Sequence, residues 1–161
     1  MFGFEKKPRE DINIYAPVTG EVIPLEKVPD PVFAQKMMGD GYAVVPTASE
    51  IVAPIAGKIT LIQGHAVGLQ RFDGLEVLLH IGIDTVSVNG KPFTTKAKVG
   101  QVVAAGDVLV AVDWSQIDAA QLSKMTMVLI TNTTDKLENI VVQYGQAIAG
   151  QQLGQAIARR N

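Results

Sequence analysis

The two histidines, His65 and His80, are the side chains of this 161-residue chain best suited to chemistry at neutral pH. His80 lies within residues 75–86, an apolar run that predicts a buried strand. Side chains alternate between the two faces of a strand. One predicted face is wholly apolar and comprises Leu75, Val77, Leu79, Ile81 and Ile83. The other comprises Leu78, His80, Gly82 and Asp84, so an imidazole, a carboxylate and bare backbone share one side.

His65 is predicted to lie beside His80 on a neighbouring strand. Residues 59–69 form the preceding apolar segment, and Asp73-Gly74 between the two segments is a strong hairpin signal. If Asp73-Gly74 is the centre of the turn, Val67 faces His80 and His65 is its diagonal neighbour. If the centre lies one residue earlier, His65 faces His80 directly. Both registers put the two rings on the same face, roughly 5–8 Å apart at the backbone.

Zinc-dependent hydrolysis is one chemistry that a histidine and a carboxylate can serve. The spacing His80-x-x-x-Asp84 resembles the His/Asp pair of lysostaphin-like zinc peptidases. A catalytic zinc ion normally has three protein ligands, and this chain has no histidine after His80. Residues four apart on a strand also lie about 13 Å apart, so both side chains reach one ion only if the strand bends. The sequence therefore disfavours zinc hydrolysis.

Phosphoryl transfer through a phosphohistidine fits the pair better. Neutral imidazole is abundant near pH 7, because the ordinary pKa of histidine is about 6.5. A second imidazole can donate a hydrogen bond to the phosphoryl oxygens, and Gly82 lets a partner's ring approach the strand. Such chemistry depends on positioning and charge stabilisation, and it can run between two protein surfaces. Val67, Leu78 and Val86 are predicted to form the apolar rim of such a surface.

Composition excludes several other classes of protein. With 47% hydrophobic and 19% charged residues, the chain can bury one core, and its length favours one domain. A net charge of −2 without a basic stripe argues against binding to nucleic acid. The chain has no cysteine, no signal-peptide pattern and no apolar run near the ~20 residues of a membrane span. We expect a monomeric, cytoplasmic protein without membrane insertion, with a flexible lead-in over residues 1–11 and one domain over residues 12–161.

Short strands at close turn spacing predict an all-β fold, an antiparallel sandwich or barrel with one or two very short helices. Residues 14–25 and 51–62 share Ile, Ala, Pro and Gly at a fixed offset of 37, which indicates two pseudo-symmetric hairpins. Further strands are expected at 42–46, 96–99, 102–103, 108–113, 125–131 and 140–144, with a hairpin tip at 89–90 and a short helix within 114–122. The tail, residues 145–160, fits either helix or short strands.

A helical turn is expected after Asp30, because aspartate caps helices and Pro31 suits the first helical position. Val32, Phe33 and Met37 fall at helical spacing. On this pattern alone, the three apolar side chains form either part of the core or an exposed apolar patch, and the pattern favours the core.

The segment His80-Ile-Gly-Ile-Asp84-Thr-Val, preceded by Gly74-Leu-Glu-Val-Leu-Leu and by His65-Ala66, is distinctive, as is the segment VPDPVFAQKMMGDGYAVVP at 28–46. Together they resemble the glucose-family enzyme IIA of the bacterial phosphoenolpyruvate sugar phosphotransferase system. The similarity runs from about Ile14 to the C-terminus without large gaps. The separation of the two histidines agrees with it as well.

This resemblance implies a phosphotransferase component of sugar uptake that forms a phosphohistidine. His80 matches the histidine that the phosphocarrier protein HPr phosphorylates on Nε2. His65 matches the histidine needed to pass the phosphoryl group to a cysteine of a IIB domain, and Asp84 matches a carboxylate beside the site. The apolar, acid-rimmed surface that docks both partners matches Asp30, Val32, Phe33, Met37, Leu78 and Val86. On this view Val32, Phe33 and Met37 belong to the docking surface.

The chain departs from the family pattern at Gln63, where the family usually has a threonine that bonds to the first imidazole. Gln63 lies on the predicted face of the histidines and can bond to a ring nitrogen through a longer arm, so we expect His65 to be held more loosely. The resemblance implies no required cofactor. In some relatives a zinc ion bridges the two histidines, here His65 and His80, and the unphosphorylated protein regulates transporters or enzymes.

The Ala-Pro-x-x-Gly repeats also resemble biotinyl and lipoyl carrier domains. Those domains display a lysine within Met-Lys-Met at a hairpin tip. Lys124-Met125 comes near this pattern, but Ser123 and Thr126 break it. The sequence therefore favours the phosphoryl carrier over the carrier domain.

Overall fold

The structure of the chain, a computed structural model, describes residues 6–160. Its strands are β1 (Asn13–Tyr15), β2 (Gly20–Pro24), β3 (Asp40–Pro46), β4 (Glu50–Val52), β5 (Gly57–Gln63), β6 (Ala66–Gln70), β7 (Glu76–Ile81), β8 (Phe93–Thr95), β9 (Val102–Val103), β10 (Val108–Val112), β11 (Thr126–Ile130), β12 (Leu137–Val142), β13 (Gly145–Ala147) and β14 (Gln152–Ala158). Its helices are η1 (Leu25–Lys27), α1 (Pro31–Ala34), η2 (Thr85–Val88), α2 (Trp114–Ala119) and α3 (Thr133–Lys136), of which η1 and η2 are 3-10 helices. The predicted all-β fold is confirmed, with three short α-helices in this part of the chain instead of one or two.

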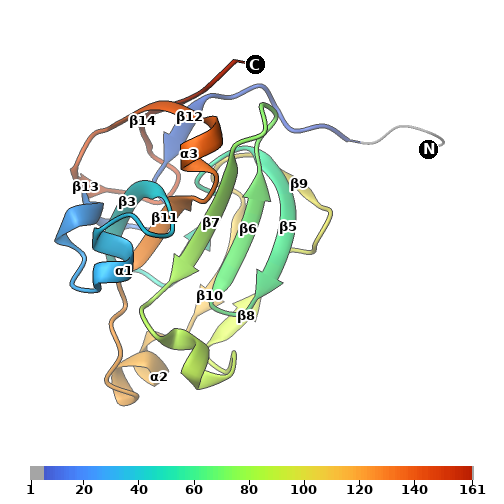
Figure 1. Cartoon of the computed structure of the whole chain (residues 1–161). Helices are drawn as coiled ribbons and strands as arrows, with labels where there is room; N and C mark the ends of the chain where they lie inside the picture. The colour runs from blue at the N-terminus through green and yellow to red at the C-terminus, as the bar shows by residue number, and fades with distance from the viewer. Residues whose placement is uncertain (1–5, 161) are drawn as a thin grey trace.

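The strands form three antiparallel sheets around one main core. The large sheet has the order β13-β2-β3-β11-β7-β6-β5-β9, and the small sheets have the orders β1-β14-β12 and β4-β10-β8. Buried side chains from all three sheets meet in this core, for example Leu79 of β7, Leu109 of β10 and Leu153 of β14. In Figure 1, β5, β6 and β7 lie side by side in front of β8 and β10. The architecture is a β-sandwich.

The two repeated segments are related in the structure as the sequence predicts. β1 and β4 begin 37 residues apart, as do β2 and β5. The N–H of Tyr15 donates to the carbonyl of Pro54 at 2.9 Å, and the N–H of Val52 donates to the carbonyl of Pro17 at 2.7 Å. These bonds are equivalent under the offset of 37, so the two hairpins bind each other reciprocally about a pseudo-two-fold axis.

A smaller core lies on the outer face of the large sheet. Residues after η1 and in α1, including Val28 and Phe33, pack there against Ala43 of β3 and Leu129 of β11. All five residues of β11 are buried, because the strand has a core on each face. Asp30 caps α1 as predicted, its Oδ1 accepting from the N–H of Val32 at 2.8 Å. This cap sets α1 in front of β3 and β11 (Figure 1).

Several local predictions are wrong. Residues 89–90 do not form a hairpin tip, because η2 ends there and Asn89 adopts a left-handed conformation with φ +54°. The segment 59–69 is two strands, β5 and β6, joined by a turn at Gly64 and His65. The strand predicted over 75–86 ends at Ile81, and residues 96–99 are not a strand. The tail, ambiguous in sequence, forms β13 and β14. Of the predicted lead-in over residues 1–11, residues 1–5 lie outside the described part, and the single domain over 12–161 stays a prediction.

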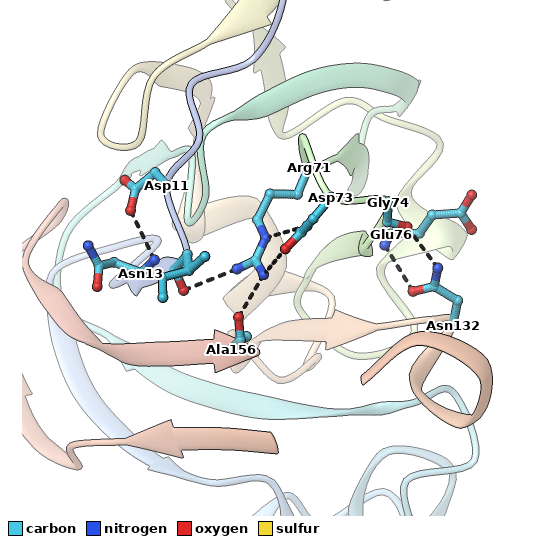
Figure 2. Close-up of polar contacts among 9 residues, drawn as sticks. Asp11, Asn13, Arg71, Asp73, Gly74, Glu76, Asn132 and Ala156 are labelled. Atoms are coloured by element: carbon cyan, nitrogen blue, oxygen red, sulfur yellow. Dashed lines mark hydrogen bonds and ion pairs between the residues drawn. The ribbon is translucent and has the colours of Figure 1, made fainter. Parts of the chain in front are cut away.

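Arg71, at the end of β6, joins three distant segments. It is 2% exposed, and its guanidinium donates from Nε and Nη2 to the carboxylate of Asp73 at 2.8 and 2.6 Å. Nη1 also donates to the carbonyl of Ile12 at 3.1 Å, and Nη2 to that of Ala156 at 2.6 Å (Figure 2). A buried guanidinium needs such a full set of acceptors to offset its loss of water. Both ends of the described chain are thereby bound to the β6–β7 turn.

Asn132 holds the other side of the same turn. Its Oδ1 accepts from the N–H of Glu76 at 2.9 Å, and its Nδ2 donates to the carbonyl of Gly74 at 2.9 Å (Figure 2). The turn also closes through the N–H of Arg71, which donates to the carbonyl of Leu75 at 2.9 Å. These bonds fix the register of β6 against β7.

Candidate active site

The structure brings the two histidine rings together in a register that the sequence did not predict. Ala66, the first residue of β6, pairs with His80, midway between the two predicted alternatives. His65 precedes it in a two-residue turn in which Gly64 has φ +47°, as suits the first position of a type II′ turn. The N–H of Ile81 donates to the carbonyl of His65 at 2.7 Å. The ring centroids lie 5.1 Å apart, with the ring planes at 73°.

A backbone hydrogen bond fixes which nitrogen of His80 is free. Its Nδ1 lies 2.7 Å from the carbonyl oxygen of Gly82. A carbonyl only accepts, so Nδ1 must carry the proton, and in the neutral ring Nε2 then keeps its lone pair. The neutral His80 ring is therefore oriented to act as a nucleophile through Nε2.

Burial favours the neutral form of both imidazoles. It lowers the pKa of His80 below the ordinary value for histidine, and the neighbouring His65 lowers it further. The hydrogen bond to Gly82 and the charges of Asp84 and Asp30 oppose this shift. Burial likewise lowers the pKa of His65, and a contact with the backbone of Gln63 opposes it. The neutral form of each ring is accordingly favoured at pH 7.

A sharp bend follows His80 and returns the chain toward its ring. Gly82 has φ +79° and Asp84 has φ +60°, so the strand alternation predicted for residues 82–84 does not apply. Ile83 packs in the smaller outer core and not with Leu79 in the main one, which corrects the predicted apolar face. Asp84 nevertheless lines a pocket with His80, because the bend shortens the distance that a straight strand would impose.

Gln63 contacts His65 through its backbone, and the bond predicted from its side chain stays a prediction. The residue pairs with Ala66 at the end of β5, and its side chain is exposed. The contact that affects the His65 ring comes from its backbone, which any residue type could supply. The looser hold on His65 that we expected from a longer side chain likewise stays a prediction.

Two shallow pockets flank the histidine pair and share Val86. One, of about 200 Å³, is lined by Asp30, Val32, Phe33, His80, Asp84 and Val86. The other, of about 390 Å³, is lined by Gln63, Gly64, His65, Val86, Asn89 and Gly90. A larger pocket of about 610 Å³ beside Arg71 lies at the opposite end of β6 and contains neither histidine. The histidine pair is the better candidate site, because no histidine lines the larger pocket.

The apolar residues expected around the histidines differ in exposure. Val32, Met37 and Val86 are exposed by 40%, 70% and 64%, whereas Phe33 is 6% exposed. Leu78 is half-buried on β7. The core prediction made from pattern alone is thus wrong for Val32 and Met37. Phe33 is buried, but its ring also lies 5.1 Å from that of His80.

A family model described as the phosphoenolpyruvate-dependent sugar phosphotransferase system, EIIA 1, matches residues 12–136. This chain belongs to that family. A glucose-specific EIIA component from Oceanobacillus iheyensis is 42% identical over 153 residues, covering 94% of this chain and 93% of the relative. One from Staphylococcus epidermidis is 43% identical over 150 residues, covering 92% and 90%. The solved glucose permease IIA from Mycoplasma capricolum has a TM-score of 0.78 and 35% identity, covering 96% of this chain and 97% of that one.

The alternatives to an enzyme IIA find no support in the described residues. No group of three or more His, Cys, Asp or Glu side chains in residues 6–160 could hold a metal ion, so neither a zinc hydrolase nor a zinc bridge is supported. Lys124 pairs with Asp118 at 3.4 Å between α2 and β11, and not at a hairpin tip as in a carrier domain. The longest helix in this part of the chain, α2, has six residues, and no helix there could cross a membrane.

The sequence did not predict a role for Thr85 in this enzyme IIA. Thr85 is fully buried beside the site, and its hydroxyl donates to the carbonyl of Ile81. The residue stands inside the distinctive segment, but its type and spacing predict no chemistry. The signal is structural, since only the bend at Gly82 brings Thr85 back to β7.

Proposed function

We propose that this enzyme IIA carries a phosphoryl group on Nε2 of His80, which it receives from phospho-HPr and passes to a cysteine of a IIB domain. The observation that supports this most directly is the hydrogen bond from Nδ1 of His80 to Gly82, since it leaves Nε2 as the free nucleophile. The neighbouring ring of His65 and the shallow, open pockets suit a transfer between two protein surfaces.

The first transfer needs only the groups at this site and the donor. The Nε2 lone pair attacks phosphorus, and the bond from phosphorus to the donor's imidazole nitrogen breaks, with its electron pair returning to that nitrogen. The ring of His80 becomes positively charged, with its proton still on Nδ1. The carbonyl of Gly82 stabilises this charge, because its dipole already points at Nδ1.

The second transfer reverses these roles. A cysteine thiolate of IIB attacks phosphorus, the Nε2–P bond breaks, and His80 leaves as a neutral ring protonated on Nδ1. The phosphoryl group on His80 is negatively charged, which favours protonation of the adjacent His65. A protonated His65 donates from both ring nitrogens, so it can keep its Gln63 contact and also bond a phosphoryl oxygen.

The docking surface for both partners is assigned to the exposed residues around the pair. Val32, Met37 and Val86 give it an apolar centre, and Asp30 and Asp84 lie beside His80. An apolar centre with acidic residues suits a basic partner surface, since charge complementarity speeds encounter. Because the relatives are named glucose-specific, we propose a glucose-class IIB as acceptor. The cytoplasmic location, the monomeric state and regulation by the unphosphorylated form remain predictions.

A phosphorylation relay tests the proposal. The purified chain is mixed with labelled phosphoenolpyruvate, enzyme I and HPr, and bound phosphate is tested for lability in acid and stability in base. His80→Ala should accept no label. His65→Gln should accept label but fail to transfer it to a IIB domain. Full labelling of His80→Ala would overturn the assignment.

A further inference from the structure

We infer that Thr85 is a positioning residue of this site. It fixes the backbone at Gly82 so that the Gly82 carbonyl accepts the hydrogen bond from Nδ1 of His80. The inference rests on the proposed phosphoryl-carrier function. Thr85 is 0% exposed, and Arg71, Thr85 and Thr126 are the buried polar or charged residues of the described part. A buried polar side chain is favourable only when it is hydrogen bonded, so its partner indicates its role.

The hydroxyl of Thr85 bonds to the residue between the histidine and the glycine. Its Oγ1 donates to the carbonyl of Ile81 at 2.5 Å. That carbonyl belongs to the same planar peptide as the nitrogen of Gly82, so the bond restricts how Gly82 can rotate. The N–H of Ile81 donates in turn to the carbonyl of His65. Thr85 therefore anchors Ile81, which precedes Gly82 and is also bonded to the turn at His65.

The methyl group of Thr85 closes the space around Gly82. A Cβ built on Gly82 would lie 2.4 Å from Cγ2 of Thr85 and 2.9 Å from the carbonyl oxygen of Ser123. That same oxygen accepts the N–H of Ile83 at 3.1 Å. The backbone at Gly82 is thus held on both sides, by the bond from Thr85 to the carbonyl of Ile81 and by the bond from Ile83 to the carbonyl of Ser123.

Loss of the Thr85 hydrogen bond would change which ring nitrogen of His80 carries the proton. Without a fixed acceptor at Nδ1, the neutral ring divides between two tautomers, and the one protonated on Nε2 has no lone pair there. Phosphorylation should then slow even though Thr85 touches neither donor nor phosphoryl group. A small loss of alignment at the nucleophile is sufficient for a large loss of rate.

The test compares Thr85→Val, which has nearly the same shape but no hydroxyl, with Thr85→Ser, which keeps the hydroxyl. Nitrogen NMR of the His80 ring near pH 8 should show protonation on Nδ1 in the wild type and in Thr85→Ser, and a mixture in Thr85→Val. The rate of labelling by phospho-HPr should fall about tenfold or more in Thr85→Val and stay within about threefold in Thr85→Ser. Thr85→Ala, which adds no atoms, carries the same prediction if valine is not accommodated.

The two readouts separate this inference from the function on which it rests. A folded Thr85→Val protein with the wild-type tautomer and rate would overturn the inference, as would an equal loss in Thr85→Ser. If the tautomer changes in Thr85→Val but the wild type accepts no label, the positioning role stands and the carrier function fails.

Discussion

The ring of Phe33 lies 5.1 Å from the ring of His80, centroid to centroid, and is tilted by 56° to it. Phe33 belongs to α1 and His80 to β7, so the contact joins the outer helical segment to the strand that carries the proposed nucleophile. Phe33 is 6% exposed and covers one side of the imidazole. This cover contributes to the burial that keeps the His80 ring neutral.

Removing that cover should raise the pKa of His80 toward its ordinary value. In Phe33→Ala, water reaches the ring, and loss of a buried phenylalanine should lower the free energy of unfolding by about 3–5 kcal/mol. NMR titration and urea unfolding measure the two effects. Phe72→Ala is the control, because Phe72 is more exposed and contacts Arg71. An unchanged pKa in Phe33→Ala would show that other groups desolvate His80.

The free energy of unfolding should decrease as the pH falls below about 6.5. Burial lowers the pKa of His65 and of His80 in the folded protein, so between the ordinary and the lowered pKa the unfolded chain binds more protons. Above this window both states hold neutral histidines, and the histidine contribution to stability is fully present. A His65→Gln/His80→Gln double variant should lose this part of the slope between pH 8 and pH 5 in urea titrations. Equal slopes would contradict the lowered pKa values.

Gly82→Ala should be more harmful than Gly100→Ala. Both glycines have positive φ, +79° and +91°, so alanine strains the backbone at each by about 1–2 kcal/mol. At Gly100 nothing lies within 4 Å of the added Cβ, whereas at Gly82 it would meet Thr85 and Ser123. The extra loss of stability in urea, and any loss of labelling by phospho-HPr, then measures the steric effect alone. Equal losses at the two positions would mean that the bend relaxes.

Val86→Lys should slow phosphoryl transfer without unfolding the protein. Val86 is 64% exposed between the two pockets, and Val99 is 62% exposed in the loop before Gly100. Substitutions at such exposed positions usually change stability by less than about 0.5 kcal/mol. A lysine at Val86 would place a charge at the centre of the proposed docking surface, so KM for phospho-HPr should rise in Val86→Lys and stay unchanged in Val99→Lys. Equal KM values would remove Val86 from that surface.

The sequence predicts the strands well where local pattern and tertiary contacts agree. The repeat of 37 residues, the cap at Asp30 and the helix after Asp113 depend on residue types that act on their own neighbours. α3 was not predicted, and its four residues carry little pattern.

The geometry of the site was less predictable, because it depends on backbone bends. The pattern at residues 75–86 continues past Ile81, and Gly82 is the only sign that the strand ends. The exact partner of His80 follows from the connection between β6 and β7, residues 71–75. The N–H of Arg71 closes this connection from within, and Asn132 holds it from far away in sequence. The hydrogen bond between His80 and Gly82, on which the proposed chemistry depends, is a product of that bend.

Arg71 binds the carbonyls of Ile12 and Ala156 at the end of β6 opposite His65. The five residues from Ala66 to Gln70 place about 17 Å of strand between that guanidinium and the imidazoles. A tag or a second protein joined before Ile12 or after Ala158 would extend from the end of the molecule opposite the histidines. In such fusions, and in circular permutants that connect the segments near Ile12 and Ala158, both imidazoles should therefore stay accessible to partner proteins.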